Sequence, residues 1–273
     1  MIFRFIGGNT IKSVLNNTII KKNTIPIINY IAENTTNDSN NIFLEYKNLI
    51  KHLNSDYIIA LKLSSINFNE NYLNKIIQGC KLKNIKLIID AENNKNIEKY
   101  RSIVNNAIIN HNSDDLNVIK TYQMYRKDSL HELNNDIKYF DSKNIYLSCK
   151  LVRGAYYNEE NEENEKNKEN NLFKIKNDTD LNYNKAIIKC YESGFNNNII
   201  ASHNHFSIKL AMLLNKKDKF IIANLKGMNE RFMNNITDIQ KAEYIPYGEY
   251  NEMIPYLTRR LYENIDQIKY SLL

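Results

Sequence analysis

Short, nearly continuous apolar runs recur along the chain and are separated by longer stretches with helical periodicity. The runs cover residues 25–32, 57–63, 85–90, 117–122, 145–152, 199–202, 220–225 and 242–247. Continuous apolar character is typical of strands that are covered on both faces of a parallel sheet. One stretch between the runs places Leu73, Ile76, Ile77 and Cys80 on a single helix face. Alternating strands and helices indicate successive βα units, and eight of them predict an α/β fold of the (βα)8-barrel type.

Length and composition agree with one large domain. The chain has 273 residues, of which 42% are hydrophobic, and a (βα)8 barrel needs about 250 residues. A net charge of +6 fits a solvated basic surface, and it also suits an anionic substrate or an acidic membrane surface. The chain lacks the dense basic stripe that is typical of nucleic-acid binding. Three cysteines without CxxC spacing indicate a reducing compartment, and we expect neither a disulfide framework nor a metal site.

Targeting and membrane signals are absent from the pattern. No segment approaches the roughly 18 apolar residues of a membrane span, and the first residues lack a cleavage pattern. We therefore expect a cytoplasmic protein, or one peripheral to the inner face of a respiratory membrane. A mitochondrial import signal in the Asn-rich N-terminus stays open.

One segment interrupts the alternation. Residues 158–171 are polar, Asn- and Glu-rich and of low complexity. Such composition predicts a flexible loop, here directly after the fifth strand. Loops at the carboxyl ends of barrel strands lie over the active site, so this segment is interpreted either as a lid or as an insertion without function.

Polar residues at the ends of the predicted strands are the candidates for chemistry, because barrel enzymes place their catalytic groups there. These residues are Lys62, Asp90, Gln123, Lys150, Arg153, His203, Asn204, Tyr244 and Tyr247. Neither GxGxxG nor GxxxxGK occurs, which argues against a Rossmann or P-loop nucleotide site. Taken alone, His203 also fits a core histidine, and Asp90 also fits a residue that caps the following loop.

The last helical segment carries two adjacent arginines. Tyr256 and Arg260 share a helix face, and Arg259 can pair with Glu263. Guanidinium groups bind carboxylates bidentately, and a buried Lys62 would add a third cation that requires an anionic ligand. A small carboxylate fits this arrangement, and exposed surface arginines are the alternative.

The motifs together resemble the proline dehydrogenase family over nearly the whole chain. They are FRFIGGNT, IALKLSS, IIDAE, TYQMYR, KLVRGAYY, ASHNH, LKGM, YIPYG and PYLTRRLYEN, in that order. The resemblance implies a distorted (βα)8 barrel whose last helix lies over the barrel mouth. It also implies FAD as cofactor and oxidation of L-proline to Δ1-pyrroline-5-carboxylate by hydride transfer to flavin N5. The electrons would pass to a membrane quinone, and the product would continue towards glutamate.

The resemblance also assigns roles to residues of this chain. Asp90 and Lys150 match catalytic positions, Asp90 orienting the pocket and Lys150 lying near flavin N5. Substrate contacts fall on Lys62, Arg259, Arg260, Tyr244, Tyr256, Tyr156 and Leu225. Cofactor contacts fall on Ala91, Gln123, Arg153, Gly154, Ala155, Ser202, His203, Asn204 and Glu263. Gly154 would let the backbone approach the ligand closely. A tyrosine at position 244 would crowd a ring hydroxyl, so proline is expected over 4-hydroxyproline.

The chain departs from the family pattern at a few positions. Asn224 stands where glutamine is usual, and Lys226 stands where an apolar or aromatic residue is usual, which affects the polarity of one pocket wall. Ser202 replaces a common threonine. Two other functions compete on the residues alone: a Schiff-base lyase that uses Lys62, and a basic module that binds RNA. A lyase would be colourless, and an RNA-binding module would show salt-dependent binding.

Overall fold

The computed structural model describes residues 2–18, 21–32, 38–216 and 218–263; for residues 2, 3 and 259–263 it describes the backbone alone. The strands are β1 (Thr24–Tyr30), β2 (Ile58–Lys62), β3 (Lys86–Asp90), β4 (Val118–Gln123), β5 (Cys149–Val152), β6 (Asn198–Ala201), β7 (Phe220–Leu225) and β8 (Lys241–Tyr247). They form a closed barrel in sequence order, and pairs such as β1–β2, β1–β8 and β4–β5 are parallel. The predicted (βα)8 fold is confirmed.

Among the described residues, an α-helix follows each strand, one further α-helix precedes β1, and two α-helices lie between β5 and β6. They are α1 (Ile11–Asn17), α2 (Ser39–His52), α3 (Glu70–Lys81), α4 (Ile97–His111), α5 (Ser129–Ser142), α6 (Tyr157–Asn167), α7 (Lys176–Glu192), α8 (His205–Leu214), α9 (Glu230–Asn234) and α10 (Tyr250–Glu263). Short 3-10 helices cover Ile2–Phe5, Leu63–Ile66 and Asn94–Asn96. The predicted apolar face of α3 is confirmed, since Leu73, Ile76, Ile77 and Cys80 are all buried. Within the described residues, no helix has both the length and the apolar character needed to cross a bilayer.

Contacts divide the chain into two compact units, and each is described by itself. The first unit comprises Met1–Asp90 and Ala223–Leu273, and the second comprises Ala91–Ile222. In the first unit, β1 lies between β2 and β8, and α2 packs on α3. The fully buried Tyr46 of α2 donates its hydroxyl hydrogen to the Ala60 carbonyl of β2 at 3.0 Å. The expectation of a single catalytic domain stays a prediction.

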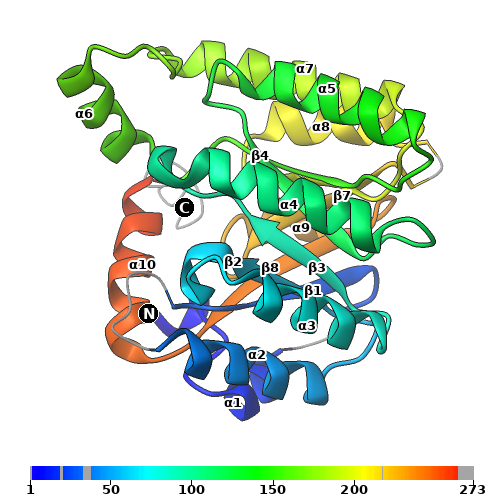
Figure 1. The fold of residues 1–273 in the computed structure, drawn as a ribbon, viewed down its shortest axis with the longest axis vertical. Helices are drawn as coiled ribbons and strands as arrows, with labels where there is room; N and C mark the ends of the chain where they lie inside the picture. Colours follow the sequence, from blue (N-terminus) through cyan, green and yellow to red (C-terminus); the bar gives the residue numbers. More distant parts are fainter. Residues whose placement is uncertain (1, 19–20, 33–37, 217, 264–273) are drawn as a thin grey trace. The chain divides into compact units, whose positions relative to one another are not determined.

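In the second unit, β4, β5 and β6 are neighbours in the sheet, and α5, α7 and α8 lie side by side (Figure 1). Buried tyrosines attach two of the helices to the strands. Tyr183 of α7 donates to the Leu151 carbonyl at 3.0 Å, and Tyr100 of α4 donates to the Thr121 carbonyl at 2.8 Å. These hydrogen bonds satisfy polar groups that would otherwise be costly to bury, and they hold the helices at defined positions on the sheet.

The fifth strand is shorter than predicted. The apolar run suggested residues 145–152, but β5 begins at Cys149. Asn112 interrupts the pairing, because its side-chain amide donates to the carbonyl of Tyr146 at 2.9 Å and to that of Val118 at 2.8 Å. The Tyr146 carbonyl is therefore bonded to a side chain in place of a neighbouring strand.

The sequence predicted a flexible loop over residues 158–171, but most of this segment lies in helix α6, which spans Tyr157–Asn167 (Figure 1). Two of its polar residues are inward-facing: Glu160 and Asn164 are 1% and 6% exposed. Glu160 accepts from Arg126 of the second unit at 2.9 Å, and acidic residues in the first turn favour the helix N-terminus. The composition of the segment gave no indication of these contacts. The role of α6 as a lid stays a prediction.

Candidate functional site

In the first unit, three of the predicted site residues lie on strands that carry them to adjacent positions. Lys62 and Asp90 end β2 and β3 and are register partners in the parallel pair. Tyr244 of β8 donates its hydroxyl hydrogen to Asp90 Oδ2 at 2.6 Å. Both side chains are buried, with 8% exposure for Asp90 and 9% for Tyr244. A short hydrogen bond to a buried carboxylate fixes the orientation of both groups.

Asn224 and Lys226, the two departures from the expected pattern at the end of β7, both make polar contacts in the structure. Asn224 donates its amide to the carbonyls of Leu225 and Met228, each at 3.0 Å, and so holds the turn that follows the strand. The Lys226 ammonium lies 3.9 Å from Glu243, and the Lys226 amide donates to the Tyr244 carbonyl at 3.0 Å. Lys226 therefore has a nearby carboxylate on the neighbouring strand.

Helix α10 carries the last predicted group. Tyr256 is 5% exposed and packs in an apolar cluster with Ile6, Ile31, Met253 and Leu257. Arg259, Arg260 and Glu263 lie in the helix by their backbone, but their side chains are outside the described residues. The predicted arginine clamp stays a prediction.

In the second unit, Arg153 follows β5 and is the centre of a polar cluster. Its Nε donates to Asp180 Oδ1 at 2.6 Å, its Nη1 to Ser202 Oγ at 2.7 Å and its Nη2 to Ser207 Oγ at 3.0 Å. The guanidinium carbon lies 4.4 Å from the centre of the Tyr183 ring. We call Arg153, Asp180, Tyr183, Ser202 and Ser207 the Arg153 cluster.

Asp180 is the anchor of this cluster. It also accepts from Lys176 at 2.8 Å. Burial by itself would raise the pKa of Asp180, but the hydrogen bonds from Lys176 and Arg153 outweigh burial and lower that pKa below its usual value. The carboxylate is therefore ionised at neutral pH and holds the guanidinium.

Residues after β6 continue the same region. Ser202 is buried, and its Oγ also accepts from the Asn204 amide at 3.0 Å. Asn204 is the N-cap of α8, where its side chain accepts from the amides of Phe206 and Ser207. The half-buried His203 lies between them. The structure thus brings Arg153 and Ser202 together and gives Asn204 a capping role that the sequence prediction did not include.

Two predicted residues lie within the strands of the second unit. Gln123 ends β4 and is 4% exposed, and Lys150 in β5 is 6% exposed. The Gln123 side-chain oxygen is buried and has no hydrogen-bond partner among the described residues. A buried acceptor without a donor is rare, so this oxygen suits a ligand that donates a hydrogen bond.

The turn after Arg153 requires glycine for a reason that the sequence did not show. Gly154 has φ +137°, and a Cβ there would lie 1.3 Å from a carbon of the Tyr125 ring. The ring occupies the space, so the structure explains the glycine without a ligand. The half-buried Ala155 and Tyr156 and the buried Ala91 are also in the second unit, and their predicted contacts stay predictions.

Sequence reasoning missed Asp180, Tyr183 and Ser207. A signal was present, because the buried face of α7 begins with the polar residues Thr179 and Asn182 before it becomes apolar. Polar residues at inward positions of an amphipathic helix indicate hydrogen-bonding partners inside the fold. No group of three or more His, Cys, Asp or Glu in the described part of the chain is placed to hold a metal ion.

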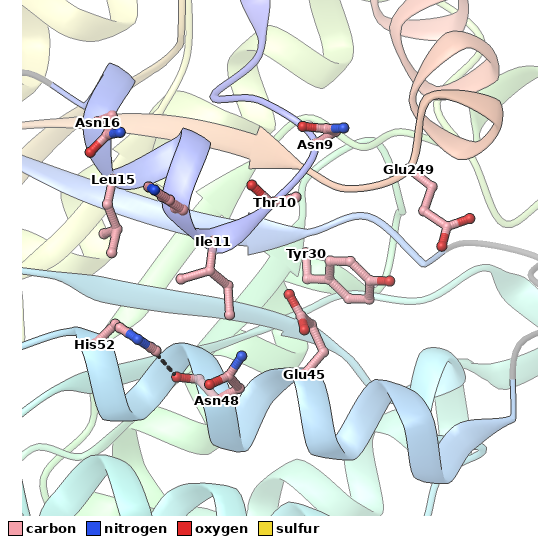
Figure 2. Close-up of a pocket in the computed structure, with 11 residues that line it drawn as sticks. Asn9, Thr10, Ile11, Leu15, Asn16, Tyr30, Glu45, Asn48, His52 and Glu249 are labelled. Carbon is pink, nitrogen blue, oxygen red and sulfur yellow. Dashed lines mark hydrogen bonds between the residues drawn. The ribbon is translucent and has the colours of Figure 1, made fainter.

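A separate pocket of about 560 Å³ occurs in the first unit (Figure 2). Its lining includes Tyr30, Glu45, His52 and Glu249, with His52 bonded to the Asn48 carbonyl at 2.9 Å. Burial, followed by the charges of Glu45 and Glu249, raises the pKa of Tyr30. None of the predicted site residues lines this pocket, so it is distinct from the groups described above.

Comparison with known families decides the classification. The protein-family model described as proline dehydrogenase matches residues 17–270. The chain belongs to the proline dehydrogenase family. The resemblance inferred from the motifs is confirmed.

Curated relatives in this family are longer than the chain. The chain is 27% identical over 265 residues to proline dehydrogenase 1, mitochondrial, of Dictyostelium discoideum, covering 91% of this chain and 46% of the relative. It is 30% identical over 209 residues to proline dehydrogenase 2, mitochondrial, of Arabidopsis thaliana, covering 70% and 44%. The match to hydroxyproline dehydrogenase of Bos taurus is 26% identical and covers 70% and 45%. The chain thus spans about half the length of these relatives.

Solved structures show the same fold. Proline utilization A (PutA) from Bdellovibrio bacteriovorus, inactivated by N-propargylglycine, superposes with a TM-score of 0.88 at 19% identity, covering 96% of this chain and 32% of that one. A Bradyrhizobium japonicum PutA variant superposes with a TM-score of 0.82 at 20% identity, covering 96% and 30%. This similarity supports the (βα)8-barrel fold described above for this chain.

The second unit offers groups that fit a flavin of the kind expected for the family. The unpartnered Gln123 oxygen can accept a hydrogen bond from a cofactor N–H. The partly exposed Arg153 side chain can donate to anionic oxygens. Both kinds of group occur in one compact unit, so the described residues are compatible with a bound FAD.

Proposed function

We propose that the chain is an FAD-dependent proline dehydrogenase that oxidises L-proline to Δ1-pyrroline-5-carboxylate. The observation that carries the proposal is the match of the family model over residues 17–270. Relatives named proline dehydrogenase in several organisms support it. The reaction would be the first step in the breakdown of proline to glutamate.

The substrate would be held by cations and by an aromatic surround. Lys62, Arg259 and Arg260 are proposed to bind the proline carboxylate, since guanidinium and ammonium groups suit a small anion. Tyr244, Tyr256, Tyr156 and Leu225 are proposed to contact the ring. Support comes from Tyr244, which is held in one orientation by its 2.6 Å hydrogen bond to Asp90.

The chemistry requires orientation and a neutral amine. FAD, when bound, supplies the acceptor at N5 for the hydride that leaves the carbon beside the proline nitrogen. The proposed cations Lys62, Arg259 and Arg260 would lower the pKa of the substrate amine by repulsion. Asp90 would keep Tyr244 in place, and Lys150 would lie on the cofactor side. Gln123, Arg153 and Ser202 are proposed to hold the cofactor, with contributions from Ala91, Gly154, Ala155, His203, Asn204 and Glu263.

Substrate choice is proposed to favour proline over 4-hydroxyproline. Tyr244 is buried, and its hydroxyl is committed to Asp90. A ring hydroxyl on the substrate would have to displace that side chain, which the surrounding barrel strands resist. The quinone acceptor, peripheral membrane contact and the compartment are likewise proposals; the net charge of +6 is compatible with an acidic membrane surface.

An absorbance spectrum tests the proposal. The purified protein, reconstituted with FAD, is expected to show a flavin band that bleaches when L-proline is added without oxygen. The same titration with 4-hydroxyproline is expected to bleach the band much less. A flavin band that ignores both compounds would contradict the substrate, and a protein that binds no FAD would contradict the enzyme class.

A further inference from the structure

The Arg153 guanidinium is held through all three of its nitrogens and on one face. Three of its N–H groups donate to Asp180, Ser202 and Ser207 at 2.6, 2.7 and 3.0 Å. The Tyr183 ring covers one face, with its centre 4.4 Å from the guanidinium carbon. Stacking and a carboxylate contact together leave such a side chain little rotational freedom.

Donor capacity remains after these contacts. A guanidinium has five N–H groups, and contacts with the described residues use one on Nε and one on each terminal nitrogen. One N–H on each terminal nitrogen is left for a ligand. The side chain is 23% exposed, so an anionic oxygen can reach it.

Helix α7 is a firm support for Asp180. Asn182 donates its amide to the Met124 carbonyl at 2.9 Å and to Ser129 Oγ at 3.1 Å. Tyr183 donates to the Leu151 carbonyl at 3.0 Å. These buried bonds lie within one turn of Asp180, so the carboxylate has a defined position relative to the end of β5.

We propose that Asp180 is a positioning residue for the cofactor: it holds the Arg153 guanidinium so that its remaining N–H groups bind an anionic oxygen of FAD. The inference rests on the proposed function, since it presumes FAD. Asp180 acts through Arg153 and has no contact of its own with the reacting atoms. Tyr183 has a supporting part, because its ring limits the plane in which the guanidinium lies.

A double-mutant cycle on FAD binding tests this. The FAD dissociation constant is measured by flavin fluorescence for wild type, Asp180→Ala, Arg153→Met and the double variant. Each single substitution is expected to weaken binding about tenfold, the scale of one charge-assisted hydrogen bond. The double variant should bind no more weakly than Arg153→Met, because Asp180 then has nothing to position.

Further variants separate positioning from a structural role. Asp180→Asn keeps an acceptor oxygen and should recover part of the affinity, and it serves as the test if Asp180→Ala does not fold. Lys176→Ala removes the other cation bonded to Asp180, and should leave the dissociation constant unchanged. The flavin absorption band of Asp180→Ala should shift in the same direction as that of Arg153→Met.

Two outcomes overturn the inference while leaving the proposed function intact. One is an Asp180→Ala variant whose FAD dissociation constant equals that of the wild type. The other is a double variant whose loss equals the product of the two single losses, which would show independent action. A wild-type protein that binds no FAD would overturn the proposed function and the inference together.

Discussion

Two clusters in the second unit contain the same kinds of group, a cation, a carboxylate and a tyrosine ring, but differ in how exposed the cation is. In the Lys120 cluster, the ammonium lies 2.6 Å from Asp136, 2.8 Å from Glu132 and 2.9 Å from Asn105, and 5.0 Å from the centre of the Tyr122 ring. The Arg153 cluster also combines a cation, a carboxylate and a tyrosine ring. The Lys120 side chain is 0% exposed, whereas that of Arg153 is 23% exposed.

The difference lies in donor capacity and position. Lys120 has three N–H donors and three acceptors around it, so no donor is left for a ligand. It sits within β4 among residues of α4 and α5. Arg153 retains two N–H groups and follows the carboxyl end of β5, where barrel enzymes bind ligands. A buried cation with satisfied donors therefore indicates a structural role, and unused donors at a strand end indicate a binding role.

The largest effect is expected for Lys120→Met. Removing the ammonium leaves the buried Asp136 without its cation and leaves Glu132 paired with Arg101 alone, which costs about 3–5 kcal/mol. Urea unfolding followed by circular dichroism would measure the loss. Lys189→Met is the matched control, because the Lys189–Glu192 pair is exposed and its loss should cost less than about 0.5 kcal/mol. Equal losses in the two variants would contradict the structural role of Lys120.

An intermediate effect is expected at a third pair, Arg126 and Glu160. Their side chains are 5% and 1% exposed, and the pair joins α6 to the end of β4. Glu160→Ala should cost up to about 3 kcal/mol, less than Lys120→Met because α6 can detach locally and release Arg126 to water. Hydrogen exchange should show faster exchange confined to α6. Unchanged protection of its amides would mean that the pair does not hold the helix.

The smallest effect is expected from the pH dependence of Asp180. Because its folded-state pKa is lowered, the ionised carboxylate contributes stability above the ordinary Asp value of 3.8 and loses it as the pH falls through the lowered pKa. The difference in unfolding free energy between wild type and Asp180→Asn should be constant near neutral pH and shrink below 3.8. A difference that grows as the pH falls would contradict the ion pair with Arg153.

The sequence pattern predicted the barrel because strands covered on both faces consist of continuous runs of apolar residues. The same criterion placed the start of β5 too early, because at Tyr146 the Asn112 side chain takes the place of a strand partner. Helix α6 was missed because its stabilising contacts, such as Glu160 with Arg126, join residues distant in sequence. Composition describes a segment by itself and carries no information on such partners.

Among the site residues, the sequence could predict those that lie within recognisable motifs. Arg153 and Ser202 stand in recognisable runs and are bonded to each other in the structure. Asp180 stands 27 residues after Arg153 in a helix whose function no local pattern reveals. Tyr244 and Asp90 are 154 residues apart in the sequence, so their hydrogen bond becomes evident only in the folded structure.

The most direct test of the contrast between the clusters is a paired measurement on Arg153→Met and Lys120→Met: the FAD dissociation constant and the free energy of unfolding of the FAD-free protein. Arg153→Met is expected to weaken FAD binding about tenfold at a stability cost near 1 kcal/mol, because the side chain is partly exposed. Lys120→Met is expected to lose about 3–5 kcal/mol of stability while its folded fraction binds FAD with the wild-type constant. Variants that change both quantities in the same proportion would contradict the assignment of binding to one cluster and structure to the other.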